Sequence, residues 1–225
     1  MKKNEKFNIL TINAGSSSIR FALYEKHDEL KQILSGKIER IGLKDAAFSI
    51  KQNNNKTKEN IDASDFNNAS ISLIDWFEKQ QWFKDVKAIG HRVVHGMKHT
   101  QAEMITNDLL KELNSIRNYD PDHLPAEINI IQTIQKKYSQ LLQVACFDTA
   151  FHITIPPVAK TFAIPKKYYD EGIQRYGFHG ISYSYLMQQL IKQNKEEAKG
   201  RIILAHLGNG ASIAVVKDGK CIDTS

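Results

Sequence analysis

Short apolar runs separated by small or polar residues predict how this chain begins. Residues 7–12 are apolar and rich in β-forming side chains, and the same pattern resumes over 19–24. The residues between them, 13–18, are small and include one glycine, which is typical of a tight turn. Two weaker strand patterns follow, and then residues 53–60, rich in Asn and Lys, predict an exposed hairpin tip or loop. The chain is therefore expected to open with a β-hairpin.

The middle of the chain mixes helical and strand patterns. Apolar residues near helical spacing predict helices that begin at Asp65 and at Asn107, and a third helix over 125–137. Strand patterns occur at 86–94 and 143–147. Strands and helices in mixed order, with hairpins first, favour an α/β fold with a mixed sheet. A doubly wound Rossmann fold is disfavoured, because its first strand feeds a helix.

A connection with several prolines, between residues 156 and 165, divides the chain. It marks the predicted boundary between a first domain, 1–150, and the beginning of a second domain, 151–225. The second region has a helical pattern and then a strand-turn-strand pattern over 201–216. Its small-residue turn is similar to the turn of the opening hairpin. Two such turns indicate two related half-domains that share a cleft.

Composition places the chain among ordinary globular proteins, with 41 % hydrophobic and 25 % charged residues among 225. No apolar run approaches the roughly 20 residues that a membrane span needs, and no apolar stretch of signal-peptide length follows the start. The two cysteines lack paired-ligand spacing and fit buried free thiols in a reducing compartment. We therefore expect a cytoplasmic protein without a membrane partner.

The net charge of +6 raises the question of an anionic partner. The lysines are scattered, and no stretch interleaves aromatic with basic residues in the way that a stacking platform requires. A solvated surface explains the charge better than a basic nucleic-acid-binding module, which stays a weaker alternative. The charge is compatible with a polyanionic small molecule such as a nucleotide.

The turn at 13–18 offers closely spaced backbone N–H groups and hydroxyls, which can cradle a phosphate or a hydrated metal. A plain hairpin turn is the alternative, because serine and glycine are common turn formers. The sequence contains neither a GxxxxGK[ST] P-loop nor a GxGxxG motif, so the commonest nucleotide-binding motifs are absent.

Arg92 lies near the end of the strand predicted over 86–94, where its planar fork could bind a carboxylate or a phosphate. His91, His95 and His99 are four residues apart, which raises the possibility of zinc. The metalloprotease pattern needs a glutamate after the first histidine, on a helix, and Arg92 occupies that place in a strand pattern. Structural histidines fit the pattern better.

Two further residues follow structural elements in a way that suits catalysis. Asp148 comes directly after the strand at 143–147, where a carboxylate can hold metal-bound water or orient a nucleophile. An Asp that caps the following turn is an equal alternative. His179 lies between glycines before a predicted helix, where the glycines let a ligand approach and the helix N-terminus adds positive potential. A histidine packed in a loop is the alternative.

Taken in order, five motifs resemble the successive signatures of the acetate kinase family, and the resemblance runs from about Phe7 to the last residue. The motifs occupy residues 13–18, 90–96, 147–152, 175–180 and 206–210. The resemblance implies a ribonuclease H-like, actin-like ATPase fold of the sugar kinase, Hsp70 and actin superfamily. It also implies reversible phosphoryl transfer between ATP and acetate, or a similar short carboxylate, giving ADP and acetyl phosphate, with magnesium (Mg2+) and, for the complete enzyme, a homodimer.

The resemblance assigns roles to individual residues. Asn13 would belong to the metal site, and Asp148, His179 and Arg92 would be catalytic. Arg92 would also bind the substrate. The other implied substrate-binding residues are Val94 and His123. The implied nucleotide- and phosphate-binding residues are Ser16, Ser18, Arg20, His206, Leu207, Gly208, Asn209 and Gly210.

Some positions depart from the family pattern. Arg20 stands where the family usually has a lysine that contacts the nucleotide, so the charge is kept while its geometry changes. Asp122 stands where the family has the leucine that lines the acetate methyl pocket, and Leu124 where it has asparagine. A carboxylate at that place would repel an anionic substrate. Ile181 and Tyr183 replace the usual threonine and histidine.

Family members continue beyond the length of this chain through most of a second domain, which would supply a second arginine, the adenosine-binding loops and a metal-binding glutamate. We therefore expect a second domain that is only begun here and little activity from these 225 residues alone. A non-catalytic remnant and the N-terminal half of a split enzyme are the alternatives.

Overall fold

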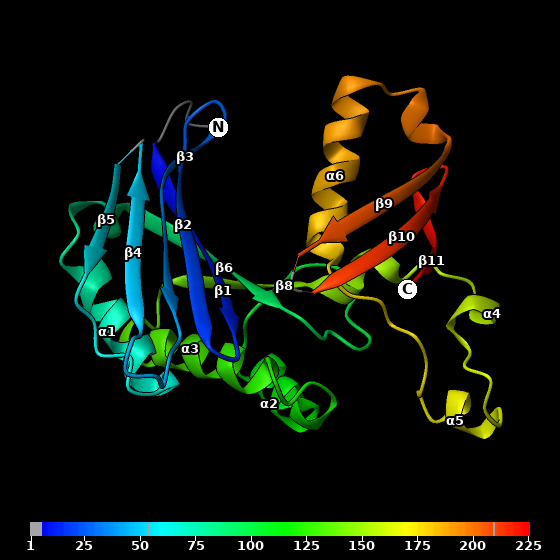
Figure 1. The fold of residues 1–225 in the computed structure, drawn as a ribbon, viewed down its shortest axis with the longest axis horizontal. Helices are drawn as coiled ribbons and strands as arrows, with labels where there is room; N and C mark the ends of the chain where they lie inside the picture. The colour runs from blue at the N-terminus through cyan, green and yellow to red at the C-terminus, as the bar shows by residue number, and fades with distance from the viewer. Residues whose placement is uncertain (1–5, 54, 209) are drawn as a thin grey trace. The chain divides into compact units, whose positions relative to one another are not determined.

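The computed structural model describes residues 6–53, 55–208 and 210–225 (Figure 1). The chain forms two compact units. The first contains Met1–Val93 and Glu103–Cys146, and the second contains Val94–Ala102 and Phe147–Ser225. The division into domains 1–150 and 151–225 stays a prediction, since compact units in one structure need not coincide with domains.

A mixed sheet forms the framework of the first unit. Among the described residues it has eight strands in the order β5-β4-β3-β2-β1-β6-β8-β7. The strands β1 to β5 pair antiparallel in succession, whereas β6 runs parallel to β1. The bounds are β1 Phe7–Gly15, β2 Ser18–Lys26, β3 Leu30–Glu39, β4 Ala47–Gln52, β5 Asn55–Glu59, β6 Val86–Val93, β7 Glu103–Met104 and β8 Leu142–Phe147. The predicted opening hairpin and mixed sheet are confirmed.

Alternation along the strands decides which face of this sheet is buried. On β2, Ile19, Phe21 and Leu23 are buried, while Arg20 between them is exposed. The buried face packs against α1 (Phe66–Glu78) and α3 (Leu124–Lys137), which lie together below the strands in Figure 1. The opposite face carries the polar side chains of the central strands, and several predicted site residues belong to it.

Aromatic rings fill much of the space between the sheet and α1. The ring of Phe21 on β2 meets the ring of Phe77 edge to face, with centroids 4.9 Å apart. Phe48 meets Trp76 in the same way at 5.2 Å. A Cβ on Gly36 would overlap the Phe21 ring, so a glycine is needed on β3 for this packing.

The helices of the first unit begin at, or within one residue of, the positions that the sequence predicts. Asp65 is the N-cap of α1, and its side chain accepts a hydrogen bond from the Asn68 backbone N–H at 2.7 Å. Thr106 caps α2 (Asn107–Ser115) in the same manner. Two 3₁₀ turns complete the helical segments of this unit, at Gln81–Asp85 and Arg117–Tyr119.

One sequence expectation needs correction. The segment 53–60 is expected from the sequence to be an exposed hairpin tip or loop. A hairpin is present, because β5 (Asn55–Glu59) pairs antiparallel with β4 from Gln52 opposite Asn55, but most of the segment is its edge strand and not a tip or loop. All five residues of β5 are exposed, so the strand lacks the alternation of apolar and polar residues by which strands are found. Its ladder partner β4 fixes it instead, through pairs such as Lys51 with Lys56.

The second unit contains a three-stranded antiparallel sheet in the order β11-β10-β9, packed on one face against α6 (Gly180–Gln193). The strands are β9 Arg201–Leu207, β10 Ala211–Lys217 and β11 Lys220–Thr224. The shorter elements are η3 Asp148–His152, α4 Pro157–Lys160, α5 Lys167–Asp170 and η4 Glu197–Lys199. The strand-turn-strand pattern predicted after residue 200 is therefore confirmed.

The two faces of this small sheet differ. Tyr183 and Met187 of α6 are buried against Leu204, Ala214 and other residues of the inner face. The outer face is also apolar. It exposes 72 % of Ile203 and 46 % of Ile213, together with Leu207 and Ile222. In the part of the chain that the structure describes, no helix is long and apolar enough to cross a membrane.

Candidate functional site

The turn of the opening hairpin is as tight as the sequence predicts. The strands β1 and β2 pair as far as Gly15 with Ser18, which leaves Ser16 and Ser17 as the turn itself. Ser16 is exposed and Ser18 is half-buried. The Ser17 carbonyl accepts a hydrogen bond from the Ile41 N–H at 3.1 Å, which ties the turn to the segment after β3. The turn thus has a fixed place at one end of the sheet.

Three predicted residues form a row across the open face of the sheet. Asn13 on β1 lies directly opposite Arg20 on β2. On the other side of β1, Ile12 is the partner of His91 on β6, so Arg92 comes beside Asn13. Arg92 Nη1 donates a hydrogen bond to Asn13 Oδ1 at 3.2 Å. The first unit therefore brings Asn13, Arg20 and Arg92 together, next to the serine turn.

His91 points to the opposite, buried face of the same strand. It is 2 % exposed, and its Nε2 lies 2.8 Å from Oε1 of Gln143. Burial lowers the pKa of His91 to about 4, partly offset by the bond to Gln143. The ring is therefore neutral at physiological pH and supports the sheet.

The structure gives His123 a local partner. It is the N-cap residue of α3, and its Nδ1 lies 2.9 Å from Oδ1 of Asp120. Leu124 begins the helix and is completely buried, whereas Asp122 is exposed. Asp122 and Leu124 are the two residues of this segment that depart from the family pattern, and of these only Asp122 is exposed. The substrate-binding role of His123 stays a prediction.

The segment after Arg92 belongs to the second unit. Val94 is 6 % exposed, and the Gly96 N–H donates to Thr149 Oγ1 at 3.1 Å. A Cβ on Gly96 would lie 2.7 Å from the Phe147 ring, so this glycine allows the segment to lie against that residue. Val94 and Arg92 are thus assigned to different units although they are two residues apart.

The neighbouring histidines pack as rings. His95 meets the Tyr176 ring edge to face, with centroids 4.7 Å apart, and its Nδ1 accepts a hydrogen bond from the Met97 N–H. His99 stacks on Phe147 with centroids 4.9 Å apart. Within the described ranges, no group of three or more His, Cys, Asp or Glu side chains is placed to hold a metal ion. These contacts favour a structural role of the histidines over zinc binding.

Asp148 begins the 3₁₀ turn that follows β8 and is only 1 % exposed. Its Oδ2 accepts a hydrogen bond from the backbone N–H of His179 at 3.3 Å. A Cβ on Gly180 would overlap the Asp148 carbonyl oxygen, so only glycine fits at the start of α6. The carboxylate and the start of the helix are therefore locked together.

His179 adopts a left-handed backbone conformation, with φ 58° and ψ 20°, as the N-cap residue of α6. This conformation is uncommon for a residue with a side chain and is often found at functional sites. The imidazole Nδ1 lies 2.8 Å from Ser212 Oγ. The ring stacks on that of His206, with centroids 4.2 Å apart and an angle of 15°. Strain and packing together fix the orientation of the ring.

The motif that ends at Gly180 gives its glycines a different role from the expected one. Gly177 has φ +79°, and a Cβ on it would lie 2.5 Å from the His152 ring. Gly177 and Gly180 therefore allow close packing inside the protein. Nε2 of His152 in turn donates to the Phe178 carbonyl oxygen, 2.9 Å away, and burial lowers the pKa of His152.

Sequence reasoning missed Ser212 and saw Tyr183 only as a departure from the family. The Tyr183 hydroxyl forms a hydrogen bond with Ser212 Oγ, which is also the partner of His179. Tyr183 is completely buried, one helical turn after His179. A signal for Ser212 was present, because it closes the small-residue turn that begins at His206. The pairing of β9 with β10 places Ser212 directly opposite His206.

The strand-turn-strand after α6 carries the predicted nucleotide-binding residues. His206 lies on the inner face of β9, with Nδ1 3.0 Å from Ser182 Oγ, and Leu207 is 82 % exposed on the outer face. A Cβ on Gly210 would lie 3.3 Å from Nε2 of His179, so the end of this turn lies next to that ring. Gly208 precedes it, and Asn209 lies outside the described residues. The second unit therefore gathers Asp148, His179, His206 and Gly210.

Comparison with known proteins gives a consistent result. A sequence model of the acetokinase family matches residues 8–225. The chain is 39 % identical over 221 residues to an acetate kinase from Chromobacterium violaceum, covering 97 % of this chain and 55 % of that protein. It is 41 % identical over 225 residues to an acetate kinase from Staphylococcus saprophyticus, with 96 % and 56 % covered. The chain thus spans about half the length of these relatives.

Solved structures agree with these relatives. A crystal structure of a propionate kinase from Francisella tularensis matches with a TM-score of 0.88 at 36 % identity, over 97 % of this chain and 57 % of that one. Porphyromonas gingivalis acetate kinase matches with a TM-score of 0.85 at 30 % identity, over the same shares. The predicted mixed α/β, actin-like ATPase fold is confirmed. By sequence and by structure, the chain belongs to the acetokinase family.

Proposed function

We propose that this protein takes part in acetate kinase-type phosphoryl transfer, in which ATP and acetate, or a similar short carboxylate, give ADP and the acyl phosphate. The observation that carries the proposal is the fixed position of His179 at the start of α6: its backbone N–H bonds to Asp148, and its imidazole is held by Ser212 and His206. Phosphoryl transfer asks a protein mainly for positioning and for positive charge or hydrogen-bond donors on the transferred group.

The contacts of His179 suit a donor role. Ser212 Oγ can accept the hydrogen bond from the Tyr183 hydroxyl and donate its own proton to Nδ1 of His179. This arrangement places the imidazole proton on Nε2, where it can donate to a phosphoryl oxygen. The stack on His206 prevents the ring from turning away. Ser212 and Tyr183 are then positioning residues for His179.

The first unit supports the proposal through Arg92. Its guanidinium is oriented by Asn13 at 3.2 Å, and a planar fork of this kind can bind a carboxylate or a phosphate through two parallel hydrogen bonds. Arg20, opposite Asn13 on the neighbouring strand, adds a second positive charge to the same face. We assign Arg92 to binding of the carboxylate substrate or of the transferring group.

Magnesium suits the oxygen donors of the predicted site residues. Mg2+ prefers hard oxygen ligands and is usually held by one or two carboxylates together with substrate phosphates. In the first unit, the Asn13 amide oxygen is a donor of that kind and already accepts a bond from Arg92. In the second unit, taken by itself, the Asp148 carboxylate is another such donor. When bound, the ion would neutralise negative charge on the phosphate oxygens. Asp148 would then orient a ligand of the ion, and its burial would keep the carboxylate in place.

Acetyl phosphate formation tests the proposal. A chimera would join these 225 residues to the part of the Staphylococcus saprophyticus acetate kinase that extends beyond the matched region. We expect ATP- and acetate-dependent acetyl phosphate in a hydroxamate assay, lowered at least about 100-fold by Arg92→Ala or His179→Ala. Arg117→Ala, an exposed arginine in the first unit, is the matched control and should keep full activity. A folded chimera without turnover would refute the proposal.

The same assay tests two further expectations, the activity of the chain alone and the choice of acyl substrate. The 225-residue polypeptide alone is predicted to give little turnover, and turnover that disappears in Arg92→Ala would contradict that prediction. Propionate as an alternative acceptor tests the acyl pocket, because a carboxylate at position 122 departs from the family pattern. The cytoplasmic location, the magnesium requirement and the homodimer of the complete enzyme stay predictions.

A further inference from the structure

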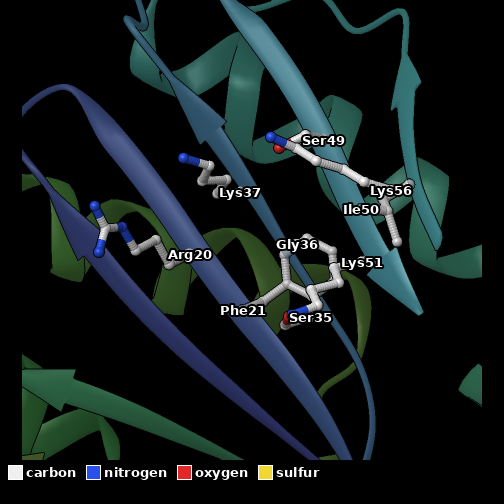
Figure 2. Close-up of a pocket in the computed structure, with 9 residues that line it drawn as sticks. All are labelled: Arg20, Phe21, Ser35, Gly36, Lys37, Ser49, Ile50, Lys51 and Lys56. Atoms are coloured by element: carbon white, nitrogen blue, oxygen red, sulfur yellow. The ribbon is translucent and has the colours of Figure 1, made fainter. Parts of the chain in front are cut away.

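A shallow hollow of about 380 Å³ opens on the exposed face of the first unit's sheet. Figure 2 shows its residues on the adjacent strands β2, β3, β4 and β5. The hydroxyl residues Ser35 and Ser49 form part of its lining, and long cationic side chains stand around them. These cations are Arg20, Lys37, Lys51 and Lys56. No carboxylate is among the described residues that line the hollow.

The strand register sets like charges directly against each other in this hollow. Arg20 on β2 is the cross-strand partner of Lys37 on β3, and Lys51 on β4 is the partner of Lys56 on β5. Like charges that are directly opposite on a sheet destabilise it. The fold therefore holds two repulsive pairs side by side, and a bound anion would relieve both.

The carboxylate of Glu39, next to the hollow, is affected by the positive charges that surround the hollow. Glu39 forms an ion pair with Lys37 at 2.6 Å, which compensates one of the cations. The pKa of Glu39 is lowered first by its hydrogen bond to Lys37, and additionally by the charges of Arg20 and Lys56. Arg20 and Lys56 thus both lower the pKa of Glu39, although they lie on strands on opposite sides of β3.

Protection of the sheet edge accounts for only part of this cluster. Lysines on an exposed edge strand prevent it from pairing with another chain, and Lys56 and Lys58 on β5 fit that role. Arg20 and Lys37 lie on the inner strands β2 and β3, where no edge needs protection. Edge protection therefore does not account for the pair that these two residues form.

We propose that this hollow is an anion-binding site for a short polyphosphate chain, separate from the serine turn of the proposed phosphotransferase. Guanidinium, ammonium and hydroxyl groups are the side chains with which proteins usually bind phosphate oxygens. Several cations around one hollow suit a ligand with several charges better than a single carboxylate. Arg20 is the one lining residue that also has a role in the proposed function.

Binding of inorganic tripolyphosphate to the 225-residue polypeptide tests this site by isothermal titration calorimetry. We expect saturable binding that weakens as salt rises, because the ligand displaces counterions. The double variant Lys51→Gln/Lys56→Gln should bind at least about tenfold more weakly. The matched control, Lys192→Gln/Lys195→Gln, removes two exposed lysines from the second unit and should bind as the unchanged chain does.

Three readouts distinguish binding in this hollow from binding elsewhere on the chain. Without ligand, the Lys51→Gln/Lys56→Gln variant should melt no lower than the parent, because one repulsive pair has been removed. ATP as a second ligand shows whether the hollow also holds the phosphate chain of a nucleotide: ATP binding that weakens in the double variant assigns that chain to the hollow, and ATP binding that stays unchanged leaves a free polyphosphate as its ligand. Tripolyphosphate binding that is lost in Arg92→Ala but unchanged in the double variant would overturn the proposal. Binding that does not saturate would do so too.

Discussion

A single hydroxyl connects two rings in the second unit. Ser212 Oγ lies 2.8 Å from Nδ1 of His179 and also forms a hydrogen bond with Tyr183. Because a hydroxyl has one proton and two lone pairs, it can accept from one partner and donate to the other. When Ser212 accepts from Tyr183 it donates to Nδ1 of His179, and this direction leaves the imidazole proton on Nε2.

Ser212→Ala should remove the hydrogen bond that holds His179 in the tautomer with its proton on Nε2. We expect the imidazole to populate both neutral tautomers and the unfolding free energy to fall by roughly 1 kcal/mol, because one hydrogen bond is lost and the Tyr183 hydroxyl is left without its partner. Nitrogen-detected NMR of the imidazoles and urea unfolding measure the two effects. Ser182→Ala, which removes the partner of His206, should leave the His179 tautomer unchanged.

His91 makes stability depend on pH. Its pKa is lowered from 6.5 to about 4 in the folded chain, so the unfolded state binds the proton more tightly. The stabilising contribution is complete above the unfolded pKa and is lost as pH falls towards the folded value. Urea unfolding should show about 2 kcal/mol less stability from this group at about pH 5 than at about pH 7.

A variant isolates this effect from the other histidines. His91→Gln cannot take up the proton, and it keeps an amide that can bond to Gln143. The loss of stability between the two pH values should therefore be smaller in His91→Gln by the same amount. An equal loss in both proteins would show that His91 does not carry the dependence.

At the scale of elements, the start of α1 depends on one side chain. Asp65 accepts a hydrogen bond from the Asn68 N–H at 2.7 Å and has extended backbone angles, as an N-cap residue requires. Asp65→Ala should lower the free energy of unfolding by about 1 kcal/mol. Asp65→Asn keeps an acceptor oxygen and should lose much less, which thermal or urea unfolding can measure.

Local sequence patterns predict individual strands, helices and hairpins. The candidate site also depends on contacts between residues far apart in the sequence, which such patterns do not predict. Alternation identifies β1 and β2, and a polar turn fixes their register, so Asn13 opposite Arg20 follows from the chain itself. The parallel pairing of β1 with β6 joins residues far apart in sequence, so the contact of Asn13 with Arg92 could not be derived from spacing. The resemblance to a family supplied those roles instead.

The edge strands and the second unit show other limits of pattern reading. β7 has two residues, too few for any alternation, and β5 is polar throughout. Gly180 was expected to admit a ligand, and the Asp148 carbonyl fills the space instead. Such close approaches come from tertiary packing, which a single sequence does not display.

At the scale of the whole molecule, the outer face of β9 to β11 is an exposed apolar surface. Ile203 and Ile213 lie on it, and contiguous patches of this kind promote association. We expect the 225-residue polypeptide to bind the dye ANS and to associate with increasing concentration. Ile203→Thr/Ile213→Thr should lower both signals. Val158→Thr/Ile164→Thr, at exposed positions outside this sheet, should not.

A monodisperse chain that melts cooperatively and binds no dye would contradict this expectation. Light scattering over a range of concentrations, together with thermal unfolding, provides that measurement. The variants keep the inner face unchanged, because alternation places Ile203 and Ile213 on the side away from α6.

The path of the chain between the two units has a consequence for synthesis. The chain passes from the first unit to the second after Val93, returns after Ala102 and leaves again after Cys146. During translation, the first unit can complete its sheet only when β8 has emerged, well after the opening hairpin. The segment 94–102 has to wait longer, since Gly96 bonds to Thr149, which is made later. The first unit can therefore finish folding while the segment 94–102, which lies within its stretch of the chain, still waits for the rest of the second unit.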